Sequence, residues 1–300
     1  MYKSFRSADK QADHAVRQLR EHGTPRHGNA GDGRVHSIGT ERSYREALTG
    51  VAQYIKNRDG KQGDLRNLDR DTAIAYLETR AEAVGQKTLD LDRQAMQAVL
   101  GVPLPVVKSE QAAVQASRAY TTEQVAMVAD AQRDRNALAT AIAADAGLRA
   151  HELLTLRPAD ERQASAHRDW RPERFDGRGD VARYTVVGKG GLVREVALVT
   201  ALADRLEAVR LEAPRAVYDR EVRYEQHYDL AGGRQWADSF TKAAERALGW
   251  TEGAHGVRHT YAQLRMNTLQ SKGYDYRDAL GIVSQEMGHF RPDVTLVYLR

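Results

Sequence analysis

A proline-containing segment between two stretches of helical pattern is the feature that most constrains how this chain can fold. The segment GVPLPVVKSEQ begins at Gly101 and contains Pro103 and Pro105. Each proline disfavours helical backbone in the residue before it. We therefore expect the patterns on the two sides to fold as separate units, joined by a linker over 101–120. A length of 300 residues agrees with two domains of ordinary size.

The stretch before the linker predicts a small helical domain over 40–100. Its first helix has one apolar face with spacings of four, three and four, formed by Tyr44, Leu48, Val51 and Ile55. A second helix is predicted in DTAIAYLETRAEAV, capped by Asp69 or Asp71. A third is predicted to open at Thr88.

Residues 1–39 predict a flexible basic arm, because Gly, His, Asn and Asp cluster there without an apolar period. The first 120 residues hold 19 Lys and Arg against 15 Asp and Glu, whereas residues 121–300 hold 26 of each. A basic surface attracts polyanions. A surplus this small also fits an ordinary solvated surface, so charge alone does not decide between the two.

The stretch after the linker predicts a mixed domain over 121–300. Thr121 and Gln124 have the spacing of a capping box at the start of a helix, and a second helix ends at Gly147. The β-branched runs RYTVV and LVREVALV, separated by GKGG, predict a β-hairpin. The polar stretch 159–180 is expected to be a loop. The chain after residue 200 is expected to be helical, with an interruption at 214–234.

Cysteine and long apolar runs are both absent from the sequence. Without cysteine the chain has no disulfide, thiolate metal site or cysteine nucleophile, which fits a reducing compartment. No apolar run approaches the roughly 20 residues that cross a bilayer, and the first residues lack the apolar centre of a signal peptide. We expect a soluble, cytoplasmic protein that does not contact a membrane.

Three segments of the second domain place reactive side chains beside glycine or proline. DAGLRAHELLTL contains Arg149, HGVRHTYAQLRM contains His255 and Arg258, and MGHFRPDVTLVYLR contains His289 and Tyr298. His255 and Arg258 are three apart, so a helix places them on one face. Taken singly, each residue has an ordinary explanation as a cap, a solvated helix charge or a packed ring.

The middle segment allows two further readings. Val257, Tyr261 and Leu264 are spaced as a core-facing helix stripe. His255 and His259, four apart, raise the question of zinc. The glutamate of the HExxH motif and a third ligand are both missing, so we expect no metal.

In this order, the motifs resemble those of the tyrosine recombinases, or phage-type integrases. They are GLRxxEL, the hairpin lysine Lys189, HxxRHTxA, and GH followed nine residues later by tyrosine. The segment VGQKTLDLDRQAMQAVL is similar to integrases of bacterial mobile elements. The resemblance covers 120–300 through the motifs and 40–100 through the helical domain. It implies a mainly α fold with a small β-sheet, in which an N-terminal core-binding (SAM-like) domain precedes an α+β catalytic domain.

The resemblance also implies the catalytic residues, which are Arg149, Lys189, His255, Arg258, His289 and Tyr298. Glu152 matches an acidic position that supports the site. Guanidinium groups suit the charged oxygens of a phosphodiester. A tyrosine hydroxyl, with a pKa near ~10, needs a base, for which we expect His255, while Lys189 would protonate the leaving 5′-oxygen. With arginines in the electrostatic role of a metal, we expect no metal, ATP or other cofactor.

The expected partner is double-stranded DNA at a recombination site, gripped by both domains of a homotetramer, with accessory DNA-bending or directionality proteins. Candidate phosphate contacts in the helical domain over 40–100 are Arg42, Arg45, Lys56, Lys87 and Arg93. Two alternatives stay open. One is a catalytically degenerate relative that only binds DNA, and the other is a type IB topoisomerase-like enzyme with the same chemistry.

Overall fold

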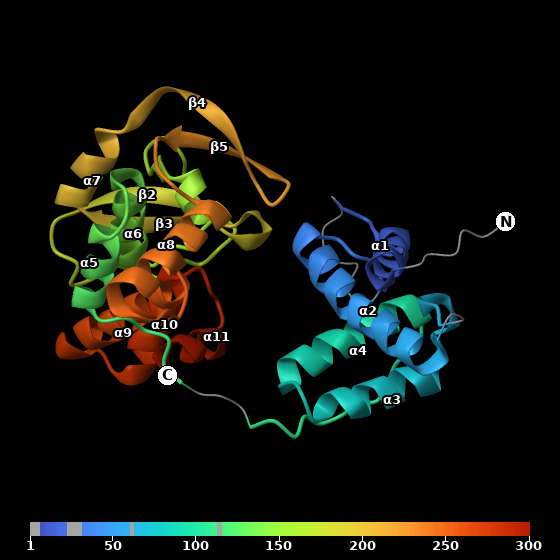
Figure 1. The fold of residues 1–300 in the computed structure, drawn as a ribbon. Coiled ribbons are helices and arrows are strands. Elements are labelled where there is room, and N and C mark those ends of the chain that lie inside the picture. The colour runs from blue at the N-terminus through green and yellow to red at the C-terminus, as the bar shows by residue number, and fades with distance from the viewer. Residues whose placement is uncertain (1–6, 23–31, 61–62, 113–115) are drawn as a thin grey trace. The chain divides into compact units, whose positions relative to one another are not determined.

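The computed structural model describes residues 7–22, 32–60, 63–112 and 116–300. The chain divides into two compact units, Met1–Val114 and Gln115–Arg300 (Figure 1). Both are built mainly of helices, with small antiparallel sheets in the second unit. The predicted mainly α fold with a small β-sheet is therefore confirmed. In the described part of the chain, no helix is both long and apolar enough to cross a membrane.

In its described residues, the first unit packs four helices around one apolar core. They are α1 (Ala8–Leu19), α2 (Ile38–Asp59), α3 (Arg70–Ala81) and α4 (Gln86–Leu100), with a 3-10 turn at Leu65–Asn67. The Asp69 side chain caps α3 by accepting a hydrogen bond from the Thr72 amide. Helix α4 begins at Gln86, two residues before the predicted start at Thr88.

Helix α1 corrects the expectation of a flexible arm over 1–39. Ala8, Ala12 and Val16 are four residues apart and are buried in the core with α2. Ser7 caps this helix through the Lys10 amide. Small and charged residues surround these three positions, so the sequence pattern hides the apolar face. The prediction for 23–31 lies outside the described residues.

The segment that follows α4 has neither helix nor strand as far as residue 112. Leu104 is buried in the core of the first unit. The side-chain amide of Gln86 donates to the Val107 carbonyl (3.1 Å) and accepts from the Ser109 amide (2.8 Å). The beginning of the predicted linker is thus packed against the first unit.

The second unit combines seven helices with two small sheets in its described residues. The helices are α5 (Thr122–Asp130), α6 (Asp134–Ala146), α7 (Thr200–Glu207), α8 (Gly233–Leu248), α9 (Gly256–Ser271), α10 (Tyr276–Glu286) and α11 (Pro292–Leu296). The strands are β1 (Arg157–Pro158), β2 (Val181–Val187), β3 (Val193–Val199), β4 (Arg210–Asp219) and β5 (Val222–Tyr228). The predicted capping box at Thr121 and Gln124 is present.

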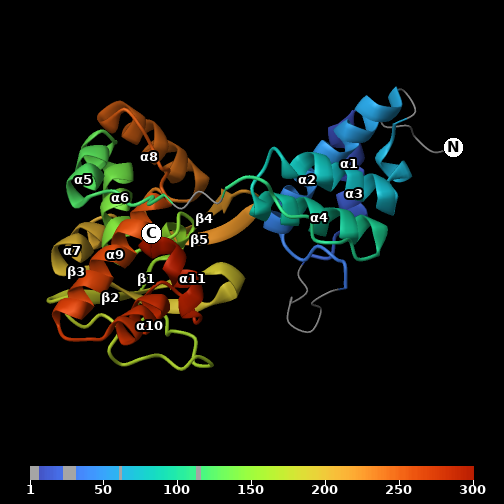
Figure 2. The ribbon, with the colours of Figure 1, turned by 90° about the horizontal axis from the view of Figure 1, so that it is seen from below.

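The three-stranded sheet has the order β1-β2-β3 and is antiparallel throughout. Tyr184 pairs with Val196, and both side chains are buried in the main core of the unit. Helices α9–α11 lie on one side of this sheet and the β4–β5 hairpin on the other (Figures 1 and 2). The sheet thus separates two regions that both approach the candidate site.

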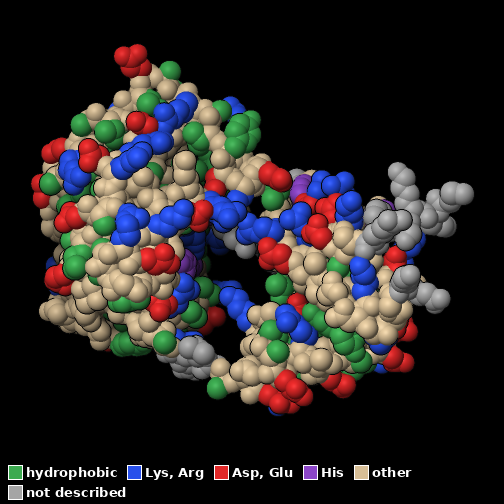
Figure 3. Space-filling view, viewed as in Figure 1, with side chains coloured by type: hydrophobic (Ala, Val, Ile, Leu, Met, Phe, Trp, Pro, Cys, Tyr) green, Lys and Arg blue, Asp and Glu red, His purple; other side chains and the backbone are tan. Residues whose placement is uncertain are grey.

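Two expectations for the second unit were partly wrong. The interruption expected at 214–234 is present as the β4–β5 hairpin, but it begins at Arg210, in a stretch that was expected to be helical. The turn of this hairpin places Arg220 and Glu221 at positive φ of 50° and 68°. Arginine side chains lie along this hairpin together with acidic ones (Figure 3). Leu264 is 48% exposed, whereas Val257 and Tyr261 are buried as the predicted stripe requires.

Candidate functional site

Arg149 is placed by the end of α6. The helix stops at Gly147, which has a left-handed φ of 60°, and a Cβ there would lie 2.5 Å from the Tyr261 ring. Only glycine suits that position. Two residues later, Arg149 donates through Nη1 to Glu152 (2.7 Å) and through Nη2 to Nε2 of His289 (2.9 Å). Its side chain keeps 23% exposure, so it faces the surface of the site.

Arg258 lies in the first turn of α9 and is fully buried. Its guanidinium donates to the carbonyl oxygens of Gly147 and Met287, the second at 3.1 Å. Its Nη2 lies 3.5 Å from Nε2 of His289. The side chain therefore ties the end of α6 to the end of α10 and brings a second positive charge next to Arg149.

Glu152 holds these arginines in place from the interior of the unit. It is fully buried, and its carboxylate accepts from Nη1 of Arg149 and from Nη2 of Arg194, each at 2.7 Å. It lies 3.8 Å from Arg258. Burial alone would raise the pKa of Glu152, but Arg194, Arg149 and Arg258 together hold it far below its ordinary value. The carboxylate is therefore charged and offsets part of the positive charge.

His289 lies between the two arginines and a hydroxyl. Its Nδ1 is 3.1 Å from Oγ1 of Thr295, while Nε2 faces both guanidinium groups. Burial, Arg258 and Arg149 lower the pKa of His289 to about 3. Because guanidinium groups only donate, Nε2 accepts and Nδ1 carries the proton, which it donates to Thr295.

Tyr298 completes the cluster from the C-terminal side. Pro292 opens α11, and Tyr298 follows in the 3-10 turn Val297–Leu299. Its hydroxyl lies 3.1 Å from Nε2 of His255, and the Arg258 guanidinium lies 5.4 Å from its ring centroid. Partial burial of the ring and the charge of Arg258 lower the pKa of His255 to about 4. At neutral pH, His255 is thus uncharged, and its Nε2 lies within hydrogen-bond distance of the hydroxyl of the buried Tyr298.

Three residues of the cluster were not predicted as part of the site. Arg194 is fully buried, and in β3 it shares a face with the apolar Val196 and Leu198, so a charge in the inward register was a usable signal. The His259 ring lies 4.7 Å from the Tyr298 ring, centroid to centroid. Thr295 carries no sequence signal, because its role depends on the fold that brings it to His289.

The other predicted residues, Lys189 and the candidate phosphate contacts of the first unit, do not join this cluster through any contact that the structure describes. Lys189 lies in a 3-10 turn, Lys189–Gly191, between β2 and β3, as the hairpin prediction requires, but its side chain is outside what the structure describes. In the first unit, Arg42, Arg45 and Lys87 are exposed. Arg93 instead donates to Gln97 within α4 (3.0 Å), so it serves the fold of its own unit.

Known structures share this architecture. No family model matches the sequence, and no curated protein matches it. The XerH recombinase bound to palindromic difH substrate is 13% identical, with a TM-score of 0.57 over 98% of this chain and 90% of XerH. A lambda integrase dimer bound to a COC′ core site is 14% identical, with a TM-score of 0.55 over 97% of this chain and 76% of the integrase. The chain therefore has the fold of the tyrosine recombinases.

Proposed function

We propose that this protein is a site-specific DNA recombinase of the integrase kind, which cuts and rejoins duplex DNA through a 3′-phosphotyrosyl bond at Tyr298. The contact of 3.1 Å between the Tyr298 hydroxyl and His255 carries the proposal. A hydroxyl and an uncharged imidazole within hydrogen-bond distance, beside Arg149 and Arg258, suit the roles of nucleophile and base that we propose for them. The likeness to XerH and lambda integrase, which were crystallised with DNA, supports the substrate class.

The two arginines suit the phosphate that would be attacked. A pentavalent phosphorus concentrates negative charge on its non-bridging oxygens, and fixed guanidinium donors stabilise this charge without reorganisation. Arg149 reaches the surface of the site, while Arg258 is locked from beneath by backbone carbonyls. A single well-placed donor of this kind lowers the activation barrier by about 3–4 kcal/mol.

The proposed reaction balances without an external reagent. The Tyr298 oxygen attacks phosphorus and passes its proton to His255, while the bond from phosphorus to the 5′-oxygen breaks and Lys189 protonates that oxygen. The protein then holds a 3′-phosphotyrosyl bond, and the cut strand ends in a 5′-hydroxyl. Attack by another 5′-hydroxyl reverses the steps, so rejoining uses the energy that the covalent bond conserved.

Covalent capture of DNA tests the proposal. A pool of nicked duplexes with randomised sequence is incubated with the protein, and complexes that survive SDS are recovered and sequenced. We expect a specific sequence to be enriched and the DNA-linked peptide to contain Tyr298. Failure to capture any duplex would contradict recombinase activity. Relaxation of plasmids without the enriched sequence would instead favour a topoisomerase-like enzyme.

The low pKa of His255 predicts how cleavage depends on pH. The base must be neutral, and kcat/KM reports the pKa of the free enzyme. We expect kcat/KM to stay level from pH 7.5 to about 5.5 and to fall only below that, because an ordinary histidine pKa of 6.5 is lowered to about 4 here. His255→Ala should lower the rate by about 10²–10⁴-fold. An acidic limb at pH 6.5 or above in the wild type would contradict this assignment.

The general-acid role of Lys189 predicts rescue by a better leaving group. We expect Lys189→Ala to slow cleavage of an ordinary duplex by about 10²–10⁴-fold. In a duplex with sulfur in place of the bridging 5′-oxygen, the leaving group departs as a thiolate and needs no proton. The variant should therefore cut this duplex nearly as fast as the wild type does. An equal defect on both substrates would show that Lys189 is not the acid.

Assembly on DNA forms part of the proposal. A lambda integrase tetramer bound to a Holliday junction has the same fold, with a TM-score of 0.55 at 14% identity. We propose that this protein also acts as a homotetramer that holds two duplexes, with accessory DNA-bending proteins setting direction. Light scattering with the captured duplex is expected to give four protein copies for two DNA molecules.

A further inference from the structure

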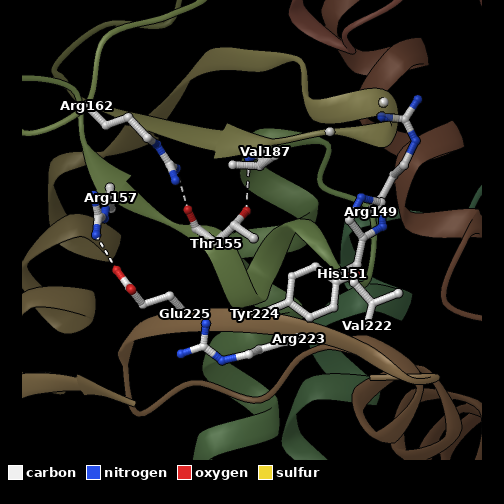
Figure 4. Close-up of a pocket in the computed structure, with 12 residues that line it drawn as sticks. Arg149, His151, Thr155, Arg157, Arg162, Val187, Val222, Arg223, Tyr224 and Glu225 are labelled. Atoms are coloured by element: carbon white, nitrogen blue, oxygen red, sulfur yellow. Dashed lines mark hydrogen bonds and ion pairs between the residues drawn. The ribbon is translucent and has the colours of Figure 1, made fainter. Parts of the chain in front are cut away.

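A cavity of about 680 Å³ opens next to Arg149, and neither His255 nor Tyr298 belongs to its lining (Figure 4). One wall is formed by the β5 segment that contains Val222 and Tyr224, and the facing wall includes Val187 at the end of β2. A phosphate alone would leave most of this volume empty. The cavity is large enough for a nucleotide, which is bulkier and partly apolar.

Two aromatic rings line this cavity. The His151 and Tyr224 rings lie beside each other, with centroids 6.3 Å apart and planes inclined by 33° (Figure 4). Burial lowers the pKa of His151, so its ring is neutral at physiological pH. Neutral aromatic faces of this kind form stacking platforms for nucleobases, and every base has a face that can stack.

Some polar groups at the cavity already have partners within the protein, and others do not. Arg157 is paired with Glu225 at 2.6 Å, and Arg162 donates to the Thr185 carbonyl at 2.8 Å. Among the described residues, no hydrogen bond or ion pair engages the His151 ring nitrogens, the Tyr224 hydroxyl or the Arg223 guanidinium. A neutral ring, a hydroxyl and an arginine are thus available to a ligand with a base and a phosphate.

The position of the cavity indicates which nucleotide it would take. Gly188 and Gly190, the neighbours of Lys189, belong to its lining. In the proposed function, on which this inference rests, Lys189 serves the leaving 5′-oxygen. The nucleotide that carries this oxygen is therefore the one next to the cavity.

We propose that this cavity binds the first nucleotide of the 5′-hydroxyl strand, with its base unstacked from the duplex and placed against Tyr224 and His151. Holding this nucleotide opens the duplex at the cut, which frees the end that must leave for strand exchange. Unstacking a base at a nick removes fewer stacking contacts than doing so within an intact duplex. The energy of stacking on the two rings offsets that cost.

A thermodynamic cycle between protein and DNA tests the proposal. Binding of the captured nicked duplex is measured in a Tyr298→Phe background, which prevents cleavage, with one abasic site placed in turn at each position around the cut. Tyr224→Leu is expected to weaken binding of the normal duplex about tenfold, as one lost base stack does. With the abasic site at the first nucleotide of the 5′-hydroxyl strand, the same substitution should have almost no effect.

Matched variants separate this result from damage to the fold. Tyr218 is 72% exposed on β4 of the same hairpin and does not line the cavity, so Tyr218→Leu should show no dependence on the abasic position. Tyr224→Phe retains the ring and should keep the coupling, and His151→Leu should reproduce part of the loss. Thermal melting checks that each variant is folded.

The outcomes distinguish this proposal from the proposed function. Normal covalent capture by the wild type without coupling at the first nucleotide, or with coupling at another position only, would overturn the nucleotide pocket and leave the recombinase intact. Equal coupling for Tyr218→Leu would also overturn it. Complete absence of covalent capture would contradict both the proposed recombinase function and the proposed nucleotide pocket.

Discussion

Tyr298→Phe is expected to abolish covalent capture of DNA, lowering it by at least about a thousandfold. The substitution removes the nucleophilic oxygen and leaves the ring, which packs against His259 at 4.7 Å. The lost hydrogen bond to His255 should cost only about 0.5–1.5 kcal/mol of stability. The variant should therefore fold and still bind the duplex. SDS gels with labelled nicked DNA measure capture, and gel shifts measure binding.

Two nearby tyrosines provide the control for this experiment. Tyr274 donates its hydroxyl to Asp176 at 3.0 Å, and this hydrogen bond raises its pKa, which makes it a poor nucleophile. Tyr276 is 51% exposed at the start of α10, outside the arginine cluster. Tyr276→Phe should capture DNA like the wild type. Capture that survives Tyr298→Phe and is lost with Tyr274→Phe or Tyr276→Phe would refute the choice of nucleophile, but not the covalent reaction.

The helices that the sequence predicted best are those with a strong apolar period. Leu48, Val51 and Ile55 are all buried on α2, as their spacing required. Helix α1 escaped prediction because its apolar face consists of two alanines and Val16 among charged residues. The β4–β5 hairpin escaped because most of its side chains are exposed on both faces, so alternation leaves no hydrophobic signal.

The site divides in a similar way between motif residues and supporting residues. Arg149, His255, Arg258, His289 and Tyr298 come from three separate segments, and the structure brings all five together. Two residues that support them, Arg194 and Thr295, stand outside the positions that define these motifs. Arg194 reaches Glu152 from another strand, and Thr295 reaches His289 across the start of α11. Such contacts depend on tertiary packing, which local sequence patterns do not encode.

Glu152→Ala is expected to destabilise the second unit by about 3–5 kcal/mol. Arg194 and Arg258 are both fully buried, and Glu152 is the carboxylate that lies closest to them in the cluster. Its removal leaves two buried cations without a counter-charge, which costs far more than a lost hydrogen bond. Urea unfolding followed by tryptophan fluorescence measures the effect. Trp170, Trp236 and Trp250 all lie in the second unit, so the signal reports this unit alone.

Glu161→Ala is the matched control, because Glu161 pairs with Arg210 while both side chains are 38% exposed. An exposed pair contributes about 0–1 kcal/mol, so this variant should unfold close to the wild type. The loss of unfolding free energy in Glu152→Ala should also depend on pH. The pKa of Glu152 is held below its ordinary 4.5, so the stabilisation is complete above that pH and declines as pH falls. Equal stability of the two variants at pH 7 would mean that the arginines do not need Glu152 as their counter-charge.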